Sequence, residues 1–414
     1  MLRKLRIVKA FLRIGHFTSK EKLAVYQAKM LRKRLTTHGT SFYPDSENLE
    51  DFPIINKQIF MNHFDQINTV DIKKDEAYNV AIQSEESRDF SSKIGEISVG
   101  LSSGTSGSRG IFLVSPEESI AWAGYILKRM LPTPYLQQHK IAFFLRANSN
   151  LYESVNSFVI KFTFYDLLIP IEEHIERLNK TQPTILIAPA QVLRLLAQSD
   201  RLKIHPKKII SVAEVLERED EVLIEERFTQ KVHQIYQCTE GFLAHTCKEG
   251  HLHLNEDRVY IEKEWIDKES GRFSPIITDF YRTSQPIIRY KLDDILVYDA
   301  TPCTCGSVFA RIQKIEGRCD DILKVHSVDK KEYHLYPDFI RRAIITASEK
   351  VEEYRVEHKE DGLHIYLQPL STEKVVDVAL QKLYQEQNIE VLTHHFHLYE
   401  KELLTQKRRR VKQL

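Results

Sequence analysis

The chain has 414 residues, of which 42% are hydrophobic and 28% charged, a balance that is ordinary for a globular protein. Lys plus Arg number 59 and Asp plus Glu 58, so the net charge of +1 argues against a strongly basic nucleic-acid-binding protein and against an acidic disordered tail. Only 14 Gly and 14 Pro are present, which excludes collagen-like and low-complexity classes.

The N-terminal segment 1–15 is predicted to be an amphipathic helix, because Leu5, Val8, Phe11 and Leu12 recur at helical spacing. It is either a surface helix or a membrane-surface anchor. Basic residues interrupt its apolar residues, and no apolar run reaches the roughly 18 residues of a spanning helix, so we expect neither a signal peptide nor a membrane span. The 5 cysteines then favour metal ligands or free thiols in a reducing compartment, and we expect a cytoplasmic protein.

The remaining elements predict an α/β protein. The first hundred residues are predicted to be mostly helical, with a capping box at 18–21 that starts a helix to about residue 34. From about residue 140, short apolar or β-branched runs alternate with helical segments, which predicts a parallel or mixed sheet covered by helices. The predicted strands are 140–145, 183–187, 208–212, 232–236, 276–278 and 286–290, and the predicted helices are 190–198 and 217–228.

After Gly317 the pattern changes to that of a small α+β domain. Asp361-Gly362 is a hairpin signal between two strand-like runs. The predicted elements are a helix at 337–348, strands at 353–358 and 363–368, a helix at 372–387 and a strand at 390–396. We therefore predict a large N-terminal domain of sheets covered by helices in several layers (1–316), a hinge (317–321) and a small, mobile α+β C-terminal domain (322–414).

A loop rich in glycine and hydroxyl side chains lies at 102–110, with the sequence Ser-Ser-Gly-Thr-Ser-Gly-Ser-Arg-Gly. Glycines let backbone N–H groups approach a polyphosphate, and hydroxyls add small donors. The loop is neither a Walker loop nor a dinucleotide fingerprint. It is a phosphate-binding loop or, alternatively, a flexible polar turn.

Three further segments follow it in the chain: 236–241 (Tyr-Gln-Cys-Thr-Glu-Gly), 289–294 (Arg-Tyr-Lys-Leu-Asp-Asp) and 317–324 (Gly-Arg-Cys-Asp-Asp-Ile-Leu-Lys). In this order the four segments resemble motifs of the adenylate-forming superfamily, which includes acyl-CoA ligases, peptide-synthetase adenylation domains and luciferases. The resemblance spans residues 95–412. It is strongest to the phenylacetate–CoA ligase-like branch and to a clade related to the synthetase that adenylylates an archaeal deazaflavin coenzyme.

The resemblance implies how ATP would be held. The β- and γ-phosphates would bind the loop, at Ser102, Ser103, Gly104, Thr105, Ser106, Gly107 and Arg109. Thr239 would touch the α-phosphate and Glu240 would bind Mg²⁺, a hard cation that prefers oxygen ligands. Tyr236 would stack on adenine beside Ala213 and Glu214. Asp294 would accept hydrogen bonds from the ribose hydroxyls, and Arg318 would support the ribose or a phosphate.

The sequence departs from the family pattern in three places. Lys407 is the candidate for the C-terminal catalytic lysine, but Gln406 replaces a usual glycine, so this tail is alternatively a basic run or a nucleic-acid patch. Ser108-Arg109 replaces Pro-Lys in the loop, and the arginine keeps the charge. The segment 325–328 after the hinge lacks the glycine of CoA-using relatives, which weakens the case for a CoA step.

Cys303 and Cys305, with Cys247 and His253, would make a tetrahedral, structural Cys₃His zinc site. Some relatives in the phenylacetate–CoA ligase group hold zinc in a similar arrangement. The spacing is not that of a zinc finger, and thiols without metal are the alternative. His251 competes with His253, because both side chains share one face if Leu252 lies in a strand.

The activity that the resemblance implies is ATP-dependent activation of a carboxylic acid, an aromatic one by family, as an acyl-adenylate with release of pyrophosphate. The acyl group would then pass to CoA or to the phosphopantetheine thiol of an acyl-carrier protein. The alternatives are an adenylyl transferase that leaves AMP on a hydroxyl acceptor and a zinc-stabilised nucleotide-binding protein without turnover. Four aromatic residues either line the acyl pocket or pack in the core: Phe143, Phe144, Tyr152 and Phe158.

Overall fold

The computed structural model describes residues 2–87, 89, 92–102, 109–132, 135, 137–145, 160–400 and 408–414. The chain divides into two compact units, the first formed by Met1–Leu292 and Tyr298–Lys314 and the second by Asp293–Val297 and Ile315–Leu414. The residues predicted as a hinge, 317–321, belong to the second unit, and their movement stays a prediction.

Helices in the first unit begin where the sequence offers caps. Ser115 and Glu118 form a capping box at the start of α6, with a proline in its first turn. Ser19 caps α2, one residue later than the predicted box at 18–21. The helices are α1 (Leu2–Leu12), α2 (Lys20–Thr36), α3 (Lys57–Asn62), α4 (Phe64–Ile67), α5 (Lys74–Ser87), α6 (Pro116–Met130), α8 (Ile171–Thr181), α9 (Ala190–Ala197) and α10 (Arg218–Phe228).

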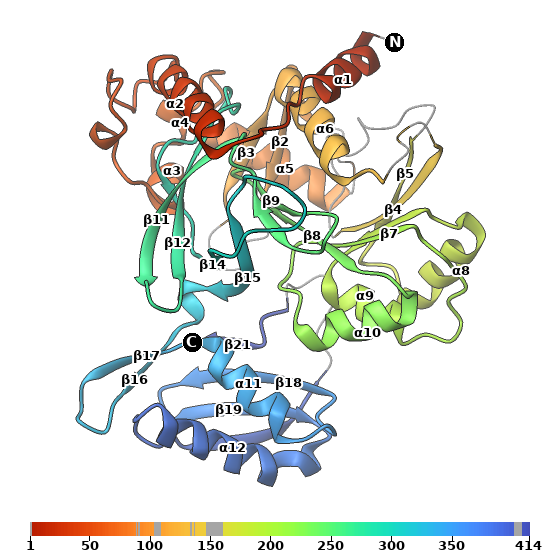
Figure 1. Cartoon of the computed structure of the whole chain (residues 1–414), viewed down its shortest axis with the longest axis vertical. Helices are drawn as coiled ribbons and strands as arrows, with labels where there is room; N and C mark the ends of the chain where they lie inside the picture. The colour runs from red at the N-terminus through yellow and green to blue at the C-terminus, as the bar shows by residue number, and fades with distance from the viewer. Residues whose placement is uncertain are drawn as a thin grey trace. The chain divides into compact units, whose positions relative to one another are not determined.

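A large mixed sheet crosses the first unit (Figure 1), with the strand order β11-β12-β14-β15-β10-β9-β8-β7-β6-β4-β5, and β13 pairs with β12. The strands β5, β4, β6, β7 and β8 pair in parallel, and α8, α9 and α10 connect them, as the alternation of strand and helix predicted. From β8 through β9 and β10 to β15 the pairing is antiparallel.

The strand bounds in the first unit, including two strands that continue into the second, are as follows. They are β1 (Lys93–Ile94), β2 (Ile97–Leu101), β3 (Ile111–Val114), β4 (His139–Leu145), β5 (Ile160–Asp166), β6 (Ile185–Ala188), β7 (Lys208–Ser211), β8 (Val232–Gln237), β9 (Phe242–Thr246), β10 (Leu252–Leu254), β11 (Val259–Asp267), β12 (Arg272–Asp279), β13 (Tyr290–Lys291), β14 (Asp294–Asp299) and β15 (Arg311–Arg318).

A second, three-stranded sheet has the order β1-β2-β3 and is covered by α5. Its apolar core includes Ile111 and Leu113 from β3 and Ala77 from α5. The predicted phosphate loop connects β2 to β3, which pair antiparallel with Leu101 opposite Ile111. This small sheet therefore holds both ends of the loop.

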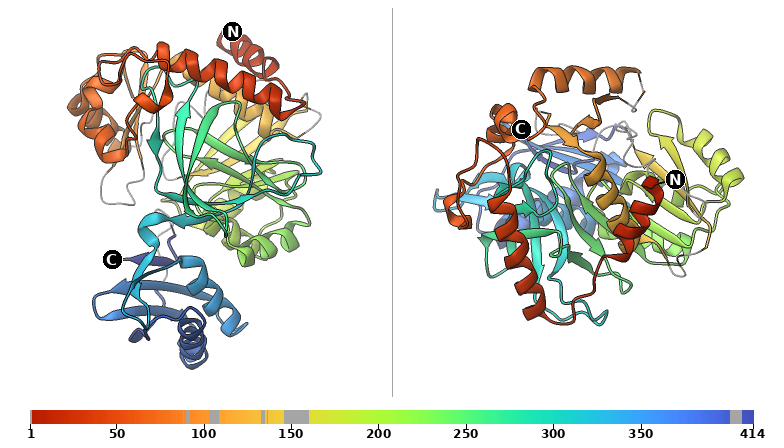
Figure 2. Two further views of the ribbon diagram at one scale, coloured as in Figure 1. Left: turned by 60° about the vertical axis from the view of Figure 1, so that its left-hand side comes forward. Right: turned by 90° about the horizontal axis from the view of Figure 1, so that it is seen from above.

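The N-terminal helix α1 packs along α6 (Figure 2), with Ile7 and Phe11 in the core between them. The two helices meet at Gly124, where an added Cβ would lie 2.6 Å from the side chain of Ala10. Leu5, Val8 and Leu12 are exposed on the other side of α1. Among the described residues, no helix is both long and apolar enough to traverse a bilayer.

The second unit is a four-stranded sheet with the order β20-β19-β18-β21, with α11 and α12 on one face (Figure 1). Both helices contribute to one apolar core with the inward side chains of β18 and β19. Its elements are β16 (Leu323–His326), β17 (Glu332–Leu335), α11 (Pro337–Ala347), β18 (Glu353–Lys359), β19 (Gly362–Gln368), α12 (Glu373–Glu386), β20 (His394–Leu398) and β21 (Val411–Gln413). The predicted α/β class with a small α+β part is confirmed.

Candidate functional site

A cavity in the first unit brings together three separated segments of the chain, and it encloses about 280 Å³ of empty volume that is open to solvent. Gly110, the last residue of the predicted phosphate loop, lines it together with Thr239 and Glu240 of the second motif. The other lining residues come from α3, from β3 and from the segment 282–290, and they are Lys57, Phe60, Met61, Ile111, Phe112, Arg282, Gln285, Ile287 and Tyr290.

The loop closes as a hairpin on its first and last residues. The backbone N–H of Ser102 donates to the carbonyl of Gly110 at 2.8 Å, and the N–H of Gly110 donates to the Ser102 hydroxyl at 2.7 Å. Arg109 donates from Nε to the Ser102 carbonyl at 2.9 Å and pairs with Glu85 of α5 at 2.5 Å. The charge of Arg109 is thus balanced by a carboxylate. The predicted loop residues Ser103, Gly104, Thr105, Ser106 and Gly107 lie outside the described residues.

Thr239 and Glu240 form the tip of the hairpin between β8 and β9. The backbone N–H of Cys238 donates to the carbonyl of Gly241 at 3.0 Å, which closes the turn. The Thr239 hydroxyl donates to Glu240 Oε2 at 2.8 Å. The turn therefore presents a hydroxyl and a carboxylate side by side at the cavity, and the carboxylate oxygens suit a hard cation such as Mg²⁺.

Arg282 fixes this turn, and the sequence motifs did not point to it. Its Nη1 donates to the carbonyl of Thr239 at 2.8 Å, and its Nη2 donates to the carbonyl of Leu113 in β3 at 3.1 Å and to the side chain of Gln285 at 3.2 Å. One guanidinium thus links the turn to the strand that follows the loop. A planar fork of donors makes such a link possible, which a lysine would not.

A buried carboxylate, Glu118 of α6, holds the neighbouring segment. It accepts hydrogen bonds from the backbone N–H groups of Ser115 at 2.6 Å, Thr283 at 2.6 Å and Ser284 at 3.0 Å, and from the Ser284 hydroxyl. Burial alone would raise the pKa of Glu118, but the charge of Arg282 and these hydrogen bonds lower it below the ordinary value. Glu118 is therefore an ionised support beneath the cavity wall.

The adenine candidates lie at the carboxyl ends of two adjacent parallel strands. Ser211 of β7 pairs with Gln234 of β8, so Ala213 and Tyr236 follow at the same edge of the sheet. Ala213 is exposed and has a φ of 67°, in the left-handed region. The Glu214 carboxylate accepts from the backbone N–H of Gln191 at 3.1 Å, at the start of α9, while Tyr236 is 7% exposed.

The ribose candidates lie in the second unit and contact one another. Asp294 and Arg318 approach to 3.9 Å, from Oδ1 to Nε. Nη1 of Arg318 is buried and, within the described part of the chain, has no hydrogen-bond partner. Arg289 of the same motif has a different place, since it pairs with Glu262 at 2.9 Å and donates to the carbonyl of Phe52 at 3.1 Å.

Several predicted residues need no site role or cannot be placed. Phe144 is fully buried and stacks on Tyr165 with a centroid separation of 4.8 Å, and Phe143 packs in the core, so core packing accounts for both. Lys407, Tyr152 and Phe158 lie outside the described residues.

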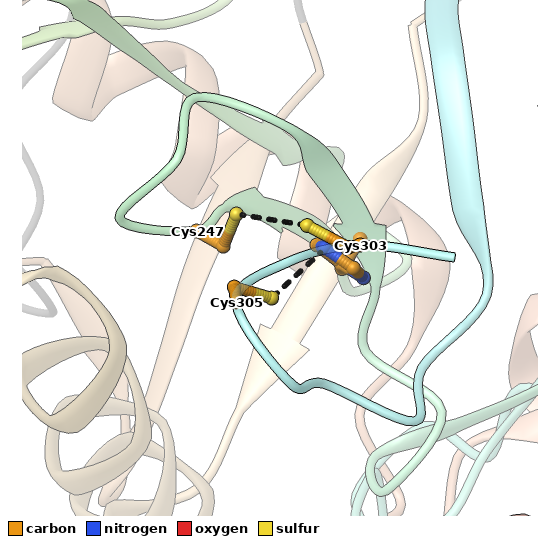
Figure 3. Close-up of side chains that lie close together, drawn as sticks. Cys247, Cys303 and Cys305 are labelled. Atoms are coloured by element: carbon orange, nitrogen blue, oxygen red, sulfur yellow. Dashed lines mark hydrogen bonds between the residues drawn. The ribbon is translucent and has the colours of Figure 1, made fainter. Parts of the chain in front are cut away.

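The four predicted zinc ligands gather at one point of the first unit, with all their ligand atoms within 4.8 Å of one another. Cys247 lies between β9 and β10, and Cys303 and Cys305 lie in the loop before β15 (Figure 3). The sulfurs of Cys247 and Cys303 are 3.8 Å apart, and Cys305 Sγ is 3.5 Å from His253 Nε2. For tetrahedral zinc, bonds of about 2.3 Å to sulfur and about 2.05 Å to nitrogen give edges of about 3.8 Å and about 3.5 Å. The donor set therefore fits the ion.

The surroundings of this cluster suit thiolates and a fixed imidazole. The Nδ1 of His253 lies 3.0 Å from the carbonyl of Phe309, so Nδ1–H donates to that carbonyl and Nε2 is left as the ligand. The backbone N–H of Ser307 donates to Cys305 Sγ at 3.3 Å. His251 also approaches Cys303, at 3.2 Å, but it is not among the four mutually close groups.

Comparisons with known proteins agree with this geometry. No family model matches the chain. Protein CapK of Staphylococcus aureus is 30% identical over 165 residues, which cover 37% of this chain and 35% of that protein. A phenylacetate–coenzyme A ligase of Thermus thermophilus is 26% identical over 117 residues, which cover 27% of this chain and 25% of that protein. The chain therefore matches about a third and a quarter of the lengths of these relatives.

Solved structures match over more of the chain. A 2-hydroxyisobutyryl-CoA ligase in the postadenylation state with 2-HIB-AMP has a TM-score of 0.70 at 15% identity, covering 96% of this chain and 91% of that one. The amide bond synthetase McbA of Marinactinospora thermotolerans has a TM-score of 0.55 at 12% identity, covering 76% and 67%. ATP-bound MatB of Rhodopseudomonas palustris has a TM-score of 0.54 at 13% identity, covering 76% and 66%. These structures confirm, at the level of the fold, the resemblance that the four motifs indicated.

Proposed function

We propose that this chain, which has the fold of the adenylate-forming ligases, activates a carboxylic acid with ATP. A carboxylate oxygen of the acid attacks the α-phosphorus of ATP, the bond from that phosphorus to the β-phosphate bridging oxygen breaks, and acyl-adenylate and pyrophosphate result. The observation that carries the proposal is the single cavity shared by Gly110, Thr239 and Glu240. The first belongs to the loop that we assign to the β- and γ-phosphates, and the other two to the turn that we assign to the α-phosphate and Mg²⁺.

Charge neutralisation explains why these groups would lie together. ATP and the carboxylate are both anionic, so the in-line transition state needs donors and cations around the transferred phosphorus. Bound Mg²⁺ would neutralise part of the triphosphate charge, and Glu240 is the residue that would hold it. Thr239 would donate its hydroxyl to the α-phosphate instead of to Glu240. Lys57, which lines the same cavity, offers a cation that the sequence motifs did not suggest.

The remaining assignments are parts of the same proposal. Loop residues Ser102, Ser103, Gly104, Thr105, Ser106 and Gly107 hold phosphates; Tyr236 stacks on adenine beside Ala213 and Glu214; Asp294 and Arg318 hold the ribose; Lys407 is the C-terminal lysine. The partnerless Nη1 of Arg318 among the described residues supports a ligand there, because buried donors are rarely left unpaired. Arg109 keeps Glu85 as its partner and positions the base of the loop.

The acceptor of the acyl group is proposed to be a thiol, of CoA or of a carrier-protein phosphopantetheine. Support comes from the 2-hydroxyisobutyryl-CoA ligase, which has also been solved with 2-HIB-AMP and CoA in the thioesterification state, with a TM-score of 0.53. The sulfur would attack the acyl carbon and release AMP. Zinc at Cys247, His253, Cys303 and Cys305 would be structural, because four protein ligands leave no open position.

The direct test is pyrophosphate release from ATP and Mg²⁺, screened over a panel of carboxylic acids that includes aromatic and short hydroxy acids. At least one acid should raise the release above the acid-free rate, and Glu240→Gln should abolish that increase. If AMP instead appears on a hydroxyl compound, the chain is an adenylyl transferase. ATP binding without pyrophosphate release under any condition would indicate a nucleotide-binding protein without turnover.

A further inference from the structure

Three histidines and a tyrosine form a continuous stack on one face of the sheet in the second unit. β19 and β20 run in parallel with His364 opposite His395 and Tyr366 opposite His397. Leu363, Ile365 and Leu367 of β19 are fully buried with α11 and α12, so the alternating residues point to the other face. Ring centroids are 4.7 Å apart for His364 and His395, 5.2 Å for His364 and His397, and 4.8 Å for Tyr366 and His397.

A carboxylate joins the first two of these imidazoles. Asp361, at the turn between β18 and β19, places Oδ1 2.9 Å from His364 Nε2 and Oδ2 3.6 Å from His395 Nε2. One ligand atom from each of the three residues lies within 4.8 Å of the others. Metal bonds of about 2.0–2.2 Å would separate neighbouring ligand atoms by about 2.9 Å at a right angle and about 3.4 Å in a tetrahedron. The measured separations from Asp361 bracket that range.

The ring of His395 has to turn for both nitrogens to face one ion, because it stacks on His364 at an interplanar angle of 29°. Its side chain is 37% exposed, and β20 is the terminal strand of the sheet order, which leaves room for that rotation. Asp361 is 60% exposed, so water can complete the coordination. The site would therefore be open on its solvent side, in contrast to the closed cluster of cysteines in the first unit.

A fourth residue stands where an outer partner is expected. His364 Nδ1 lies 3.0 Å from His397 Nε2. With Nε2 of His364 on a metal ion, Nδ1–H would donate to His397, which fixes both the tautomer and the ring orientation. Tyr366 stacks on the far side of His397 and is covered in turn by the guanidinium of Arg355, at 4.1 Å from the ring centroid.

We propose that Asp361, His364 and His395 form a second metal site, for a divalent transition-metal ion, with His397 as the outer hydrogen-bond partner. Two imidazoles and one carboxylate suit Zn²⁺, Co²⁺, Ni²⁺ or Cu²⁺ and disfavour Mg²⁺ and Ca²⁺, which prefer oxygen alone. The site is independent of the proposed nucleotide chemistry. It predicts a metal equivalent in addition to the one at the cysteines.

The test is a calorimetric titration of the full chain with Ni²⁺ after the cysteine cluster has been loaded with Zn²⁺ and excess zinc removed. Wild type should bind one further equivalent, His364→Gln should bind none there, and His397→Ala should bind about 10- to 100-fold more weakly. His334→Gln is the matched control, since His334 is an exposed histidine of the same unit that pairs with Glu332 and should leave binding unchanged. Binding should also weaken below about pH 6.5, where imidazoles take up protons.

A second readout does not depend on the variants folding. Paramagnetic Ni²⁺ should broaden the imidazole NMR signals of His364 and His395 in wild type at one equivalent and leave those of His334 sharp. The proposal is overturned if zinc-loaded wild type takes up no further Ni²⁺. It is equally overturned if a folded His364→Gln variant, checked by circular dichroism, binds Ni²⁺ as tightly as wild type.

Discussion

Arg282 holds Thr239 by its backbone: the guanidinium Nη1 donates to the Thr239 carbonyl at 2.8 Å, while Nη2 donates to the carbonyl of Leu113 at 3.1 Å. The two carbonyls belong to segments that lie 126 residues apart in the chain (239 − 113). One carries the proposed α-phosphate ligand, and the other belongs to the strand that starts directly after the phosphate loop. The relative position of these ligands therefore depends on one side chain.

Replacing that side chain should reduce activity more than it reduces folding. Arg282→Lys keeps a positive charge but cannot bridge both carbonyls, so the Thr239 turn should shift relative to β3. A displacement of about 1 Å can cost about 100-fold in rate, and we expect a loss of kcat of that order in acid-dependent pyrophosphate release. Arg201→Lys is the control, because Arg201 is 60% exposed in a surface ion pair with Glu176. Equal activity of both variants would mean that Arg282 does not position the turn.

Glu240 should control the requirement for Mg²⁺. Glu240→Gln removes the charge that would hold the cation and keeps the size of the side chain, so saturation should need more Mg²⁺ and the maximal rate should fall. The measurement is the Mg²⁺ dependence of pyrophosphate release at fixed ATP and acid. Glu226→Gln, at an exposed position of α10, serves as the control. A Mg²⁺ dependence that is the same in wild type and Glu240→Gln would remove Glu240 from the cation site.

The buried carboxylate of Glu118 should make stability depend on acid pH. Its folded-state pKa is lowered, so its contribution is fully present above the unfolded-state pKa, near 4.5, and is lost as the pH falls through the folded-state value. Glu118→Gln should cost about 1.5–3 kcal/mol at pH 7, as expected for hydrogen bonds to a charged group. The difference in unfolding free energy from wild type should shrink below pH 4.5. Denaturant unfolding over that pH range measures it, and a pH-independent difference would contradict the assignment.

Glu117→Gln is the matched control for that experiment. Glu117 precedes Glu118 in α6, but its side chain is 65% exposed and pairs with Arg6, which is also exposed. Exposed pairs of this kind contribute about 0–1 kcal/mol. The variant should therefore unfold close to wild type at every pH.

Metal removal should destabilise the first unit. Purified chain should contain one zinc equivalent at the cysteine cluster, and Cys303→Ser should lose it and lower the melting temperature. Without metal, burial raises the pKa of Cys305 to about 12, so its thiol would be protonated at neutral pH. Cys319→Ser, outside the cluster, should keep its zinc content. A zinc-free wild-type preparation with the same melting temperature as a zinc-loaded one would argue against a structural ion.

The sequence predicted well the elements that have a simple repeating pattern. The parallel strands β4, β6, β7 and β8 and the helices between them follow from apolar runs alternating with helical periods. The small α+β unit follows from the hairpin at Asp361-Gly362. In contrast, the strand predicted at 286–290 is mostly irregular, and only Tyr290 belongs to β13. Its apolar residues Ile287 and Ile288 are buried by tertiary packing, which periodicity cannot distinguish from strand burial.

The candidate site was only partly predictable. Thr239 and Glu240 were found because they belong to a recognisable motif. Arg282 and Glu118 act through backbone carbonyl and N–H groups of distant segments, and such contacts leave no spacing pattern in the sequence. The zinc ligands were found by residue type, but the preference for His253 over His251 depends on the carbonyl of Phe309, 56 residues away.

The most direct measurement follows oxygen from the acid into AMP. An acid that supports pyrophosphate release is supplied with ¹⁸O in its carboxylate, and the AMP formed after acyl transfer to a thiol is examined by mass spectrometry. Because a carboxylate oxygen would attack the α-phosphorus and stay with it when the acyl carbon is transferred, we predict one ¹⁸O atom in the phosphate of AMP. Unlabelled AMP, or cleavage of ATP to ADP and phosphate, would contradict the formation of an acyl-adenylate.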